Sequence, residues 1–301
     1  MFKLPGSLNR VNLINELRTL SWEAADILLH YAKLLRDGNH NKSLIKSKND
    51  NEPVTLADIE VNELIIKKIY DKFPEVEWQF LSEENNKNNS DNLKSDWLFI
   101  LDPLDGTKDF IQGTGNYAMH LALNFKNRPY IGIVLIPDKE ELWISDGNEV
   151  WCEKKSGIKI KTNLSIVTNL SDMRLVSSVN HRNELLENLI KEINFKKIVK
   201  MGSIGCKIAS ILRGESDIYI SLSLPGKSSP KDWDFAAPEA VLIGAGGAIT
   251  DIDNQPLSYN SKYFEHRGII VASNSKVNHH KICHQIKKKF EGLKTKGSNF
   301  N

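Results

Sequence analysis

The stretch from residue 97 to residue 101 is entirely apolar and leads directly into Asp102. An uninterrupted apolar run of this length is typical of a β-strand that is buried on both faces. In α/β proteins, such strands deliver the residues at their carboxyl ends to the edge of the sheet where ligands bind. The sequence therefore predicts a central strand that carries the carboxylates of Asp102 and Asp105 to one edge of a sheet.

Two further acidic clusters, Glu83-Glu84 and Asp232-Trp233-Asp234, lie far from this strand in the sequence. Taken alone, Glu83-Glu84 would most often be a solvated pair, and Asp105-Gly106 would most often be a turn. Together with Asp102 they favour one shared site, because carboxylates that are grouped at the end of a strand need cations. Hard oxygen ligands of this kind suit Mg²⁺.

The composition is that of an ordinary globular protein. Hydrophobic residues make up 40% of the 301 residues and charged residues 26%, with a formal net charge of +2, which does not favour a nucleic-acid binder. Proline, glycine and asparagine interrupt the first twenty residues, so we expect no signal peptide. The longest apolar stretches fall short of the roughly 20 residues that cross a bilayer, so we expect no transmembrane helix.

The cysteines indicate the compartment. Cys152, Cys206 and Cys283 are widely spaced and lack a Cys-x-x-Cys grouping, which is typical of reduced thiols in a cytoplasmic protein and disfavours zinc. The run Lys287-Lys288-Lys289 could make a peripheral contact with anionic lipid, but a solvated helix face is the favoured interpretation. The sequence leaves the oligomeric state open between a monomer and a homodimer.

Apolar periodicity predicts two long amphipathic helices, over residues 13–35 and after Thr55. Alternating segments between residues 117 and 145 predict a mostly antiparallel sheet, and strands and helices alternate from residue 174 onward. We therefore expect an α/β (α+β) protein with three parts: an N-terminal α+β domain at residues 1–174, a C-terminal α/β domain at residues 175–290 and a polar tail at residues 291–301.

Asp234 is predicted at the start of a helix. Pro238 follows it and is expected in the first turn, where a missing N–H is well tolerated. The free amides of that turn and the positive end of the helix dipole would suit a phosphate group.

Four motifs occur in one order that is hard to obtain by chance: Pro53-Val54-Thr55-Leu56-Ala57-Asp58, Ser82-Glu83-Glu84, Asp102-Pro103-Leu104-Asp105-Gly106-Thr107-Lys108-Asp109-Phe110 and Trp233-Asp234-Phe235-Ala236-Ala237. On these motifs the chain resembles the magnesium-dependent, lithium-sensitive phosphatases of the inositol monophosphatase family, over residues 13–274. The resemblance implies a layered α-β-α-β-α fold and inhibition by Li⁺. Periodicity alone indicates only two α/β units.

The resemblance also implies two or three Mg²⁺ ions and their ligands. One ion would be held by Glu83, Asp102 and the carbonyl oxygen of Leu104. A second would be held by Asp102, Asp105 and Asp234. Two such ions can stabilise the attacking and leaving oxygens of an in-line phosphoryl displacement while lowering the pKa of a water molecule, so that no covalent intermediate is required.

Catalytic roles are implied for Asp58 and Thr107, together with Glu83. Thr107 would orient the attacking water, and Asp58 would accept its proton or help to bind a third ion. The stretch Thr55-Leu56-Ala57-Asp58 also fits a helix capping box, which alone would be the better explanation, and the two roles are compatible. Gly106 would let the backbone approach the phosphate closely.

Within the family, Lys108-Asp109 and Ala237-Pro238-Glu239-Ala240 look more similar to the 3′(2′),5′-bisphosphate nucleotidase branch, which includes bacterial CysQ-like proteins. That branch converts 3′-phosphoadenosine 5′-phosphate to AMP and phosphate, in sulfur metabolism or nucleotide recycling. The residues that the resemblance places against such a substrate are Glu83, Leu104, Asp105, Gly106, Thr107, His181, Ser203, Lys207 and Asp234. An inositol monophosphatase or a sugar-phosphate phosphatase on the same scaffold is the alternative.

Other classes fit less well. Haloacid-dehalogenase phosphatases also contain Asp-Gly-Thr, but the position of their nucleophilic aspartate is taken here by Pro103, which cannot attack phosphorus. An EF-hand loop needs oxygen ligands at alternating positions and a glutamate at the twelfth, and the cluster lacks them. An inactive regulator would have lost a ligand, and none of the expected ligands is missing from the sequence.

Overall fold

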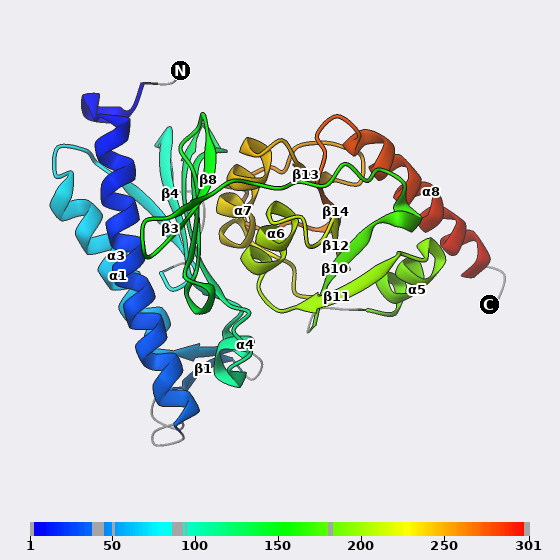
Figure 1. The fold of residues 1–301 in the computed structure, drawn as a ribbon, viewed down its shortest axis with the longest axis horizontal. Helices are drawn as coiled ribbons and strands as arrows, with labels where there is room; N and C mark the ends of the chain where they lie inside the picture. The colour runs from blue at the N-terminus through cyan, green and yellow to red at the C-terminus, as the bar shows by residue number, and fades with distance from the viewer. Residues whose placement is uncertain are drawn as a thin grey trace.

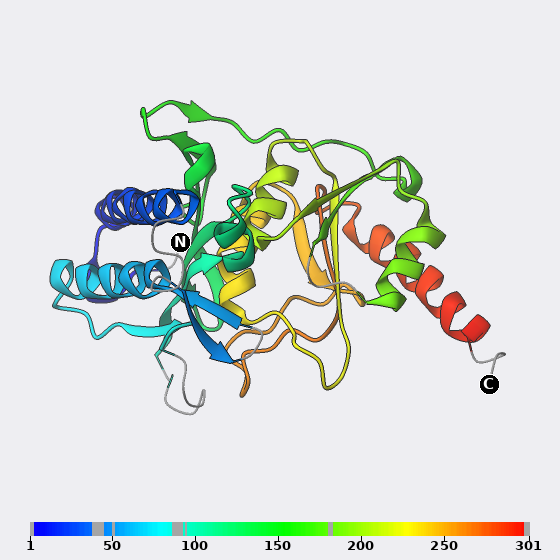
Figure 2. The same ribbon diagram turned by 90° about the horizontal axis from the view of Figure 1, so that it is seen from below.

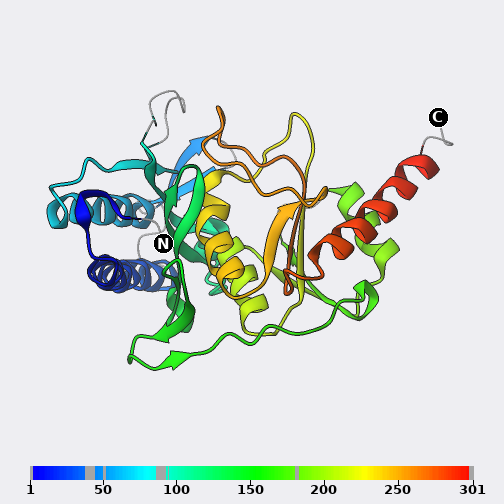
Figure 3. The ribbon, with the colours of Figure 1, turned by 90° about the horizontal axis from the view of Figure 1, so that it is seen from above.

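The computed structural model describes residues 3–37, 45–49, 52–85, 93, 95–179 and 183–297. Its elements stack in five layers in the order helix, sheet, helix, sheet, helix (Figure 1). Figures 2 and 3 view the ribbon from below and from above and show the same layers edge-on. The layered α-β-α-β-α architecture expected from the sequence is therefore confirmed.

The first two layers are a helix pair and a seven-stranded sheet in the order β3-β4-β5-β6-β7-β8-β9. β3 and β4 pair in parallel, whereas the other neighbouring strands of this sheet are antiparallel, as the alternating segments predicted. The elements are α1 (Arg10–Arg36), α3 (Leu56–Lys72), β3 (Gln79–Ser82), β4 (Trp97–Asp105), β5 (Ala118–Phe125), β6 (Arg128–Ile136), β7 (Glu141–Ser145), β8 (Val150–Lys154) and β9 (Lys159–Ile160).

An inner pair of helices, α6 and α7, separates this sheet from a five-stranded sheet in the order β11-β10-β12-β14-β13 (Figure 1). β10 is parallel to β11 and β12, and β14 is antiparallel to β12 and β13. The outer helices α5 and α8 form the last layer. The elements are β10 (Arg174–Ser178), α5 (Glu184–Ile193), β11 (Lys197–Met201), α6 (Ile204–Leu212), β12 (Ile218–Ser223), α7 (Asp232–Gly244), β13 (Ala248–Asp251), β14 (Gly268–Ser273) and α8 (His279–Gly297).

Smaller elements complete the described chain. A two-stranded ribbon precedes α3, and a short helix follows β4. These elements are β1 (Ile45–Asn49), β2 (Glu52–Thr55), α4 (Thr107–Gln112) and the 3-10 turns Pro5–Ser7, Pro137–Lys139 and Leu170–Asp172. Within the described ranges, no helix combines the length and the apolarity that a bilayer crossing requires.

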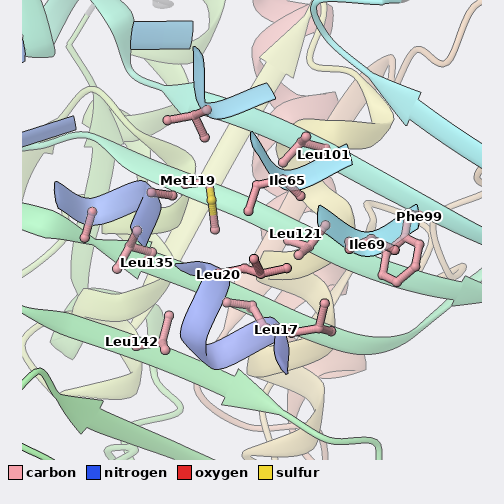
Figure 4. Close-up of a cluster of buried hydrophobic side chains, with 14 of the residues drawn as sticks. Leu17, Leu20, Ile65, Ile69, Phe99, Leu101, Met119, Leu121, Leu135 and Leu142 are labelled. Carbon is pink, nitrogen blue, oxygen red and sulfur yellow. The ribbon is translucent and has the colours of Figure 1, made fainter. Parts of the chain in front are cut away.

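β4 is buried along its whole length, as the apolar run predicted. Its side chains alternate between two cores. Phe99 and Leu101 face the core that α1 and α3 close, whereas Leu98 and Ile100 face the core on the side of α6 and α7. Figure 4 shows part of the first core and labels Leu17, Leu20, Ile65, Ile69, Phe99, Leu101, Met119, Leu121, Leu135 and Leu142.

The second core is shared by both large sheets. Ile100 of β4, Phe235 of α7 and Tyr219 of β12 belong to the same buried cluster. Along the chain, β10 is the first strand of the five-stranded sheet, and it lies at the domain boundary expected at residue 175. The division into domains stays a prediction. α8 continues to Gly297, so the described part of the expected polar tail is helical.

α7 begins at Asp232, and Asp234 lies in its first turn as predicted. Pro238 lies in the second turn, so the expectation that it occupies the first turn is wrong. Its missing N–H leaves the carbonyl oxygen of Asp234 without the usual helical donor. The amides of Asp232 and Asp234 donate to the carbonyl oxygens of Phe264 (2.8 Å) and Lys231 (3.1 Å), so these two N–H groups are not free for a phosphate.

A buried histidine anchors the start of α8 to the second sheet. His279 Nδ1 lies 2.7 Å from Ser273 Oγ, and its Nε2 lies 2.8 Å from Thr250 Oγ1. Burial lowers the pKa of His279 to about 4, because the charged imidazolium would lose its hydration there.

This histidine predicts a pH-dependent stability. The unfolded chain, with a histidine pKa of about 6.5, binds more protons than the folded chain between pH 6.5 and 4, so the free energy of unfolding falls as the pH decreases through that range. The His279→Gln variant lacks this contribution. We expect chemical denaturation to show that the stability gap between wild type and variant shrinks by about 2–3 kcal/mol from pH 7 to pH 4. A gap that stays constant would contradict the assignment.

Candidate metal centre

A bulge at the end of β4 brings two carboxylates to the same place. In a regular strand, residues three apart point to opposite faces, so Asp102 and Asp105 would diverge. Asp102 pairs with His120 on β5 and Asp105 pairs with Ala118, so β4 contains one residue more than its partner over this stretch. The extra residue bends the strand and turns both carboxylates toward one edge of the sheet.

Asp234 reaches the same point from the first turn of α7. Asp102, Asp105 and Asp234 each offer a carboxylate oxygen, and these three oxygens lie within 4.8 Å of one another. Asp102 and Asp105 are buried, and Asp234 is half-buried. The structure therefore brings together three of the carboxylates that the sequence grouped into one site.

The protein itself donates hydrogen bonds to these carboxylates. Asp102 Oδ1 accepts from the amide of Leu104 (3.0 Å). Asp105 Oδ2 accepts from Ser203 Oγ (2.6 Å) and from the amide of Gly205 (3.0 Å). Asp234 Oδ2 accepts from the amide of Lys231 (2.6 Å) at the start of α7. Each contact fixes the orientation of a carboxyl group.

Burial and mutual repulsion raise two of the three pKa values. Burial first, and then the charges of Glu83, Asp105 and Asp234, hold the pKa of Asp102 well above its ordinary value. Burial and the neighbouring Asp105 raise the pKa of Asp234 to about 6. At these two carboxylates, nearby positive charge does not offset burial and mutual repulsion.

Asp105 behaves in the opposite way. Burial alone would raise its pKa, but the charges of His120 and Lys207 and the hydrogen bond from Ser203 lower it below the ordinary value. The site thus contains one carboxylate whose ionised form the protein favours beside two whose ionised form it disfavours. Hard carboxylate oxygens with uncompensated charge at this spacing fit a divalent cation such as Mg²⁺.

Asp58 forms the capping box that the sequence predicted. Its Oδ2 accepts from the amide of Thr55 (2.8 Å) and from Thr55 Oγ1 (2.6 Å) at the start of α3. Burial, against the effect of these hydrogen bonds, raises the pKa of Asp58 to about 7. A carboxyl group with that pKa can exchange a proton near neutral pH. Its charge also raises the pKa of Asp102.

The other expected residues of the β4 end surround this cluster. The amide of Glu83 donates to the carbonyl oxygen of Leu101 (3.2 Å), and its carboxylate is close enough to raise the pKa of Asp102. Thr107 Oγ1 donates to the carbonyl oxygen of Leu104 (3.2 Å), which is an expected metal ligand. The roles of Glu83, Leu104 and Thr107 stay predictions.

Gly106 has a structural reason for being glycine. Its φ is 89°, and a Cβ there would lie 3.0 Å from the carbonyl oxygen of Asn116 and 3.1 Å from Ser203 Cβ. The left-handed backbone and the close packing against the start of α6 require glycine without any ligand. The expected approach of this backbone to a phosphate stays a prediction.

The structure places the expected nucleotide contacts Ser203 and Lys207 in contact with the protein. Ser203 caps α6 by accepting from the amide of Cys206 (3.0 Å) while donating to Asp105. Lys207 is only 1% exposed. Its Nζ donates to the carbonyl oxygen of Gly202 (2.6 Å). Contacts of Ser203 and Lys207 with a substrate stay predictions, and His181 lies outside the described residues.

Comparison with known proteins shows to which family this chain belongs. The sequence pattern of the inositol monophosphatase family matches residues 9–291, which is most of the chain. The chain belongs to the inositol monophosphatase family. A curated relative from Buchnera aphidicola, named 3′(2′),5′-bisphosphate nucleotidase CysQ, is 33% identical over 218 residues, which cover 72% of this chain and 77% of the relative. The protein of the same name from Escherichia coli K12 is 26% identical over 252 residues, which cover 83% of this chain and 95% of the relative.

Solved structures share the family fold. Inositol monophosphatase-II from Staphylococcus aureus superposes with a TM-score of 0.71 at 21% identity, covering 96% of this chain and 99% of that chain. CysQ from Bacteroides thetaiotaomicron superposes with a TM-score of 0.66 at 24% identity, covering 84% of this chain and 94% of that chain. At these identities the likeness shows the fold alone. The family and the fold that the motifs indicated are both confirmed.

Sequence reasoning missed one residue next to the family's acidic motifs. His120 lies on β5 opposite Asp102 and is fully buried, with Nε2 3.2 Å from Asp105 Oδ2. The available signal was a single histidine in the otherwise apolar run Ala118 to Leu123. A buried histidine in a strand is more often a core residue, so the signal gains meaning only from the pairing of β4 with β5.

The repulsion among these carboxylates predicts how metal affects the stability of this family member. Without metal, Asp102→Asn removes one buried charge from the cluster, so we expect its Tm in EDTA at pH 8 to exceed that of wild type by about 2–6 °C. Adding Mg²⁺ should raise the Tm of wild type, because ligand binding stabilises the folded state, and should raise that of Asp102→Asn much less.

The matched control is Asp253→Asn. Asp253 is an exposed aspartate that pairs with Lys287 away from the cluster. Its variant should keep the full Mg²⁺-dependent rise of Tm in differential scanning fluorimetry. An equal rise in Asp102→Asn and wild type would show that Asp102 does not hold the metal.

Proposed function

We propose that the protein is a Mg²⁺-dependent phosphatase that hydrolyses 3′-phosphoadenosine 5′-phosphate to AMP and phosphate. The observation that carries the proposal is the cluster of Asp102, Asp105 and Asp234 in a chain whose curated relatives are named 3′(2′),5′-bisphosphate nucleotidases. The cluster supports metal-dependent chemistry on an anionic ester, and the relatives support the choice of ester.

The proposed site would hold two ions, or three with Asp58. Glu83, Asp102 and the carbonyl oxygen of Leu104 would hold one ion, and Asp102, Asp105 and Asp234 would hold the other. When bound, Mg²⁺ neutralises the phosphate oxygens and lowers the pKa of a water molecule. Asp102 serves both ions, and the amide of Leu104 keeps one of its oxygens oriented.

Thr107 and Asp58 act on the attacking water. The hydroxyl group of Thr107 donates its hydrogen to the carbonyl oxygen of Leu104. The lone pairs of Thr107 Oγ1 therefore remain free to accept a hydrogen bond from the attacking water, which orients the water toward phosphorus. Asp58, whose pKa is about 7, takes the proton that the water loses. A bond forms between the water oxygen and phosphorus, the bond between phosphorus and the 3′-oxygen breaks, and the leaving 3′-oxygen takes a proton from solvent water to become a hydroxyl group.

We place this reaction in the cytoplasm, in sulfur metabolism or nucleotide recycling, and the same site would accept the sulfated precursor of the bisphosphate. The three cysteines support this placement, because Cys152, Cys206 and Cys283 are all buried and unpaired. Reduced thiols are typical of that compartment.

Phosphate release from the bisphosphate nucleotide and from inositol 1-phosphate tests the substrate. With Mg²⁺ present, we expect kcat/KM to be at least about a hundredfold higher for the nucleotide, because the curated relatives are named for this ester and a site that pairs with a substrate group rejects an ester that lacks it. Chromatography should identify AMP as the product, and AMP itself should not be hydrolysed. Faster hydrolysis of the inositol ester would make the alternative, an inositol or sugar-phosphate phosphatase, the correct function.

The role of Thr107 predicts a distinct mutational pattern. Thr107→Val keeps the shape of the side chain but removes the hydroxyl group, so we expect kcat to fall by about a hundredfold at saturating Mg²⁺, whereas Thr107→Ser should stay within about tenfold of wild type. The kcat of Asp102→Asn should fall by more than about a hundredfold, because Asp102 is a proposed ligand of both ions. Steady-state assays of the three variants, with Asp253→Asn as control, check these expectations. A fully active Thr107→Val variant would show that the hydroxyl group of Thr107 has no catalytic role.

A further inference from the structure

His120 occupies an unusual position in the apolar strand β5. Its side chain is completely buried, and it lies between the two segments that carry Asp105 and Asp234. A buried imidazole costs free energy unless its nitrogens have partners, so its contacts indicate what it does.

One ring nitrogen holds the start of α7. His120 Nδ1 lies 3.2 Å from the carbonyl oxygen of Trp233, the residue directly before Asp234. A carbonyl oxygen can only accept, so Nδ1 carries the proton in this contact. The hydrogen bond ties the backbone next to Asp234 to the seven-stranded sheet.

The other ring nitrogen faces the carboxylate at the end of β4. His120 Nε2 lies 3.2 Å from Asp105 Oδ2, the oxygen that also accepts from Ser203 and Gly205. The contact has the distance of an ion pair without the alignment of a hydrogen bond, and Nε2 has no hydrogen-bond partner among the described residues. A buried, unpartnered nitrogen aimed at a carboxylate cluster indicates a polar role rather than simple core packing.

The start of α6 is shaped around this imidazole. A Cβ at Gly205 would lie 2.3 Å from His120 Nε2, which no real contact allows. Glycine at position 205 therefore lets its own amide reach Asp105 Oδ2 while leaving room for the ring.

We propose that His120 is a positioning residue that fixes the separation of Asp105 and Asp234 and thereby sets the affinity of the metal site that these two carboxylates share. The inference rests on the metal-binding part of the proposed function and is independent of the substrate. Without the ring, α7 loses its tie to β5 beside Asp234. The carboxylates of Asp105 and Asp234, which repel each other, then move apart in the metal-free protein, and metal binding must bring them back together.

The test measures metal binding directly. Mn²⁺ binding to the metal-free protein is followed by the electron paramagnetic resonance signal of free Mn²⁺, a readout that needs no substrate. His120→Leu removes both polar contacts at similar volume, and His120→Asn keeps a donor for the carbonyl oxygen of Trp233 while losing the contact with Asp105. His279→Gln is the matched control, because it removes another buried histidine that lies outside the cluster and contacts Ser273 and Thr250 instead.

We expect His120→Leu to weaken the tightest Mn²⁺ site by at least about tenfold and His120→Asn by about two- to fourfold. The kcat at saturating Mg²⁺ should stay within about threefold of wild type in both. His279→Gln should lower Tm without changing Mn²⁺ affinity. Unchanged Mn²⁺ affinity in His120→Leu, or in His120→Asn if the leucine variant does not fold, would reduce His120 to a core residue and overturn the proposal.

Gly205 provides a second measurement. Gly205→Ala pushes a methyl group against His120 and should weaken Mn²⁺ binding in the wild-type background. In the His120→Ala background the ring is absent, so the same substitution should weaken Mn²⁺ binding much less than in wild type while still lowering Tm, because the methyl group also meets Ala118 and Val134. Equal effects on Mn²⁺ affinity in both backgrounds would contradict the proposal. Failure to hydrolyse the bisphosphate nucleotide would leave these binding results unaffected and would refute the substrate alone.

Discussion

The repulsion among Asp102, Asp105 and Asp234 is the constraint on which the site depends. Two buried carboxylates and a half-buried one, with oxygens within 4.8 Å of one another, are unfavourable unless protons or cations compensate them. Hydrogen bonds from the protein orient each one, but Asp105 is the member of the three whose pKa is lowered overall, mainly by His120 and Lys207. The fold therefore holds a preorganised cluster of negative charge, and this unsatisfied charge would favour the binding of a divalent cation.

The layered architecture keeps this unfavourable cluster in place. β4 is buried on both faces, so packing in two separate cores fixes the strand that ends in Asp102 and Asp105. α7 is enclosed between the two large sheets and carries Asp234 in its first turn. Because both supports belong to the hydrophobic core, the free energy of folding opposes the repulsion that would separate the carboxylates.

Polar groups around the three carboxylates connect β4 and α7 to the neighbouring elements. Ser203 and the amide of Gly205 bring the start of α6 to Asp105, and Lys207 is held one turn further on by the carbonyl oxygen of Gly202. In the proposed arrangement, His120 makes the corresponding link from β5 to α7. The residues that hold the carboxylates of β4 and α7 thus come from α6 and β5, and rigid elements of this kind keep a site in one geometry.

The sequence by itself determined the features that depend on near neighbours. The run of residues 97–101 and the capping box of Asp58 were correctly predicted because strand burial and helix starts leave local patterns. The family motifs named the acidic clusters, but only the tertiary structure decided how they meet. The bulge between Asp102 and Asp105 and the burial of Lys207 arise from strand pairing and helix packing between distant segments, and so does the place of His120. No local pattern contains those contacts, because their partners are distant in the sequence and come together only when the layers close.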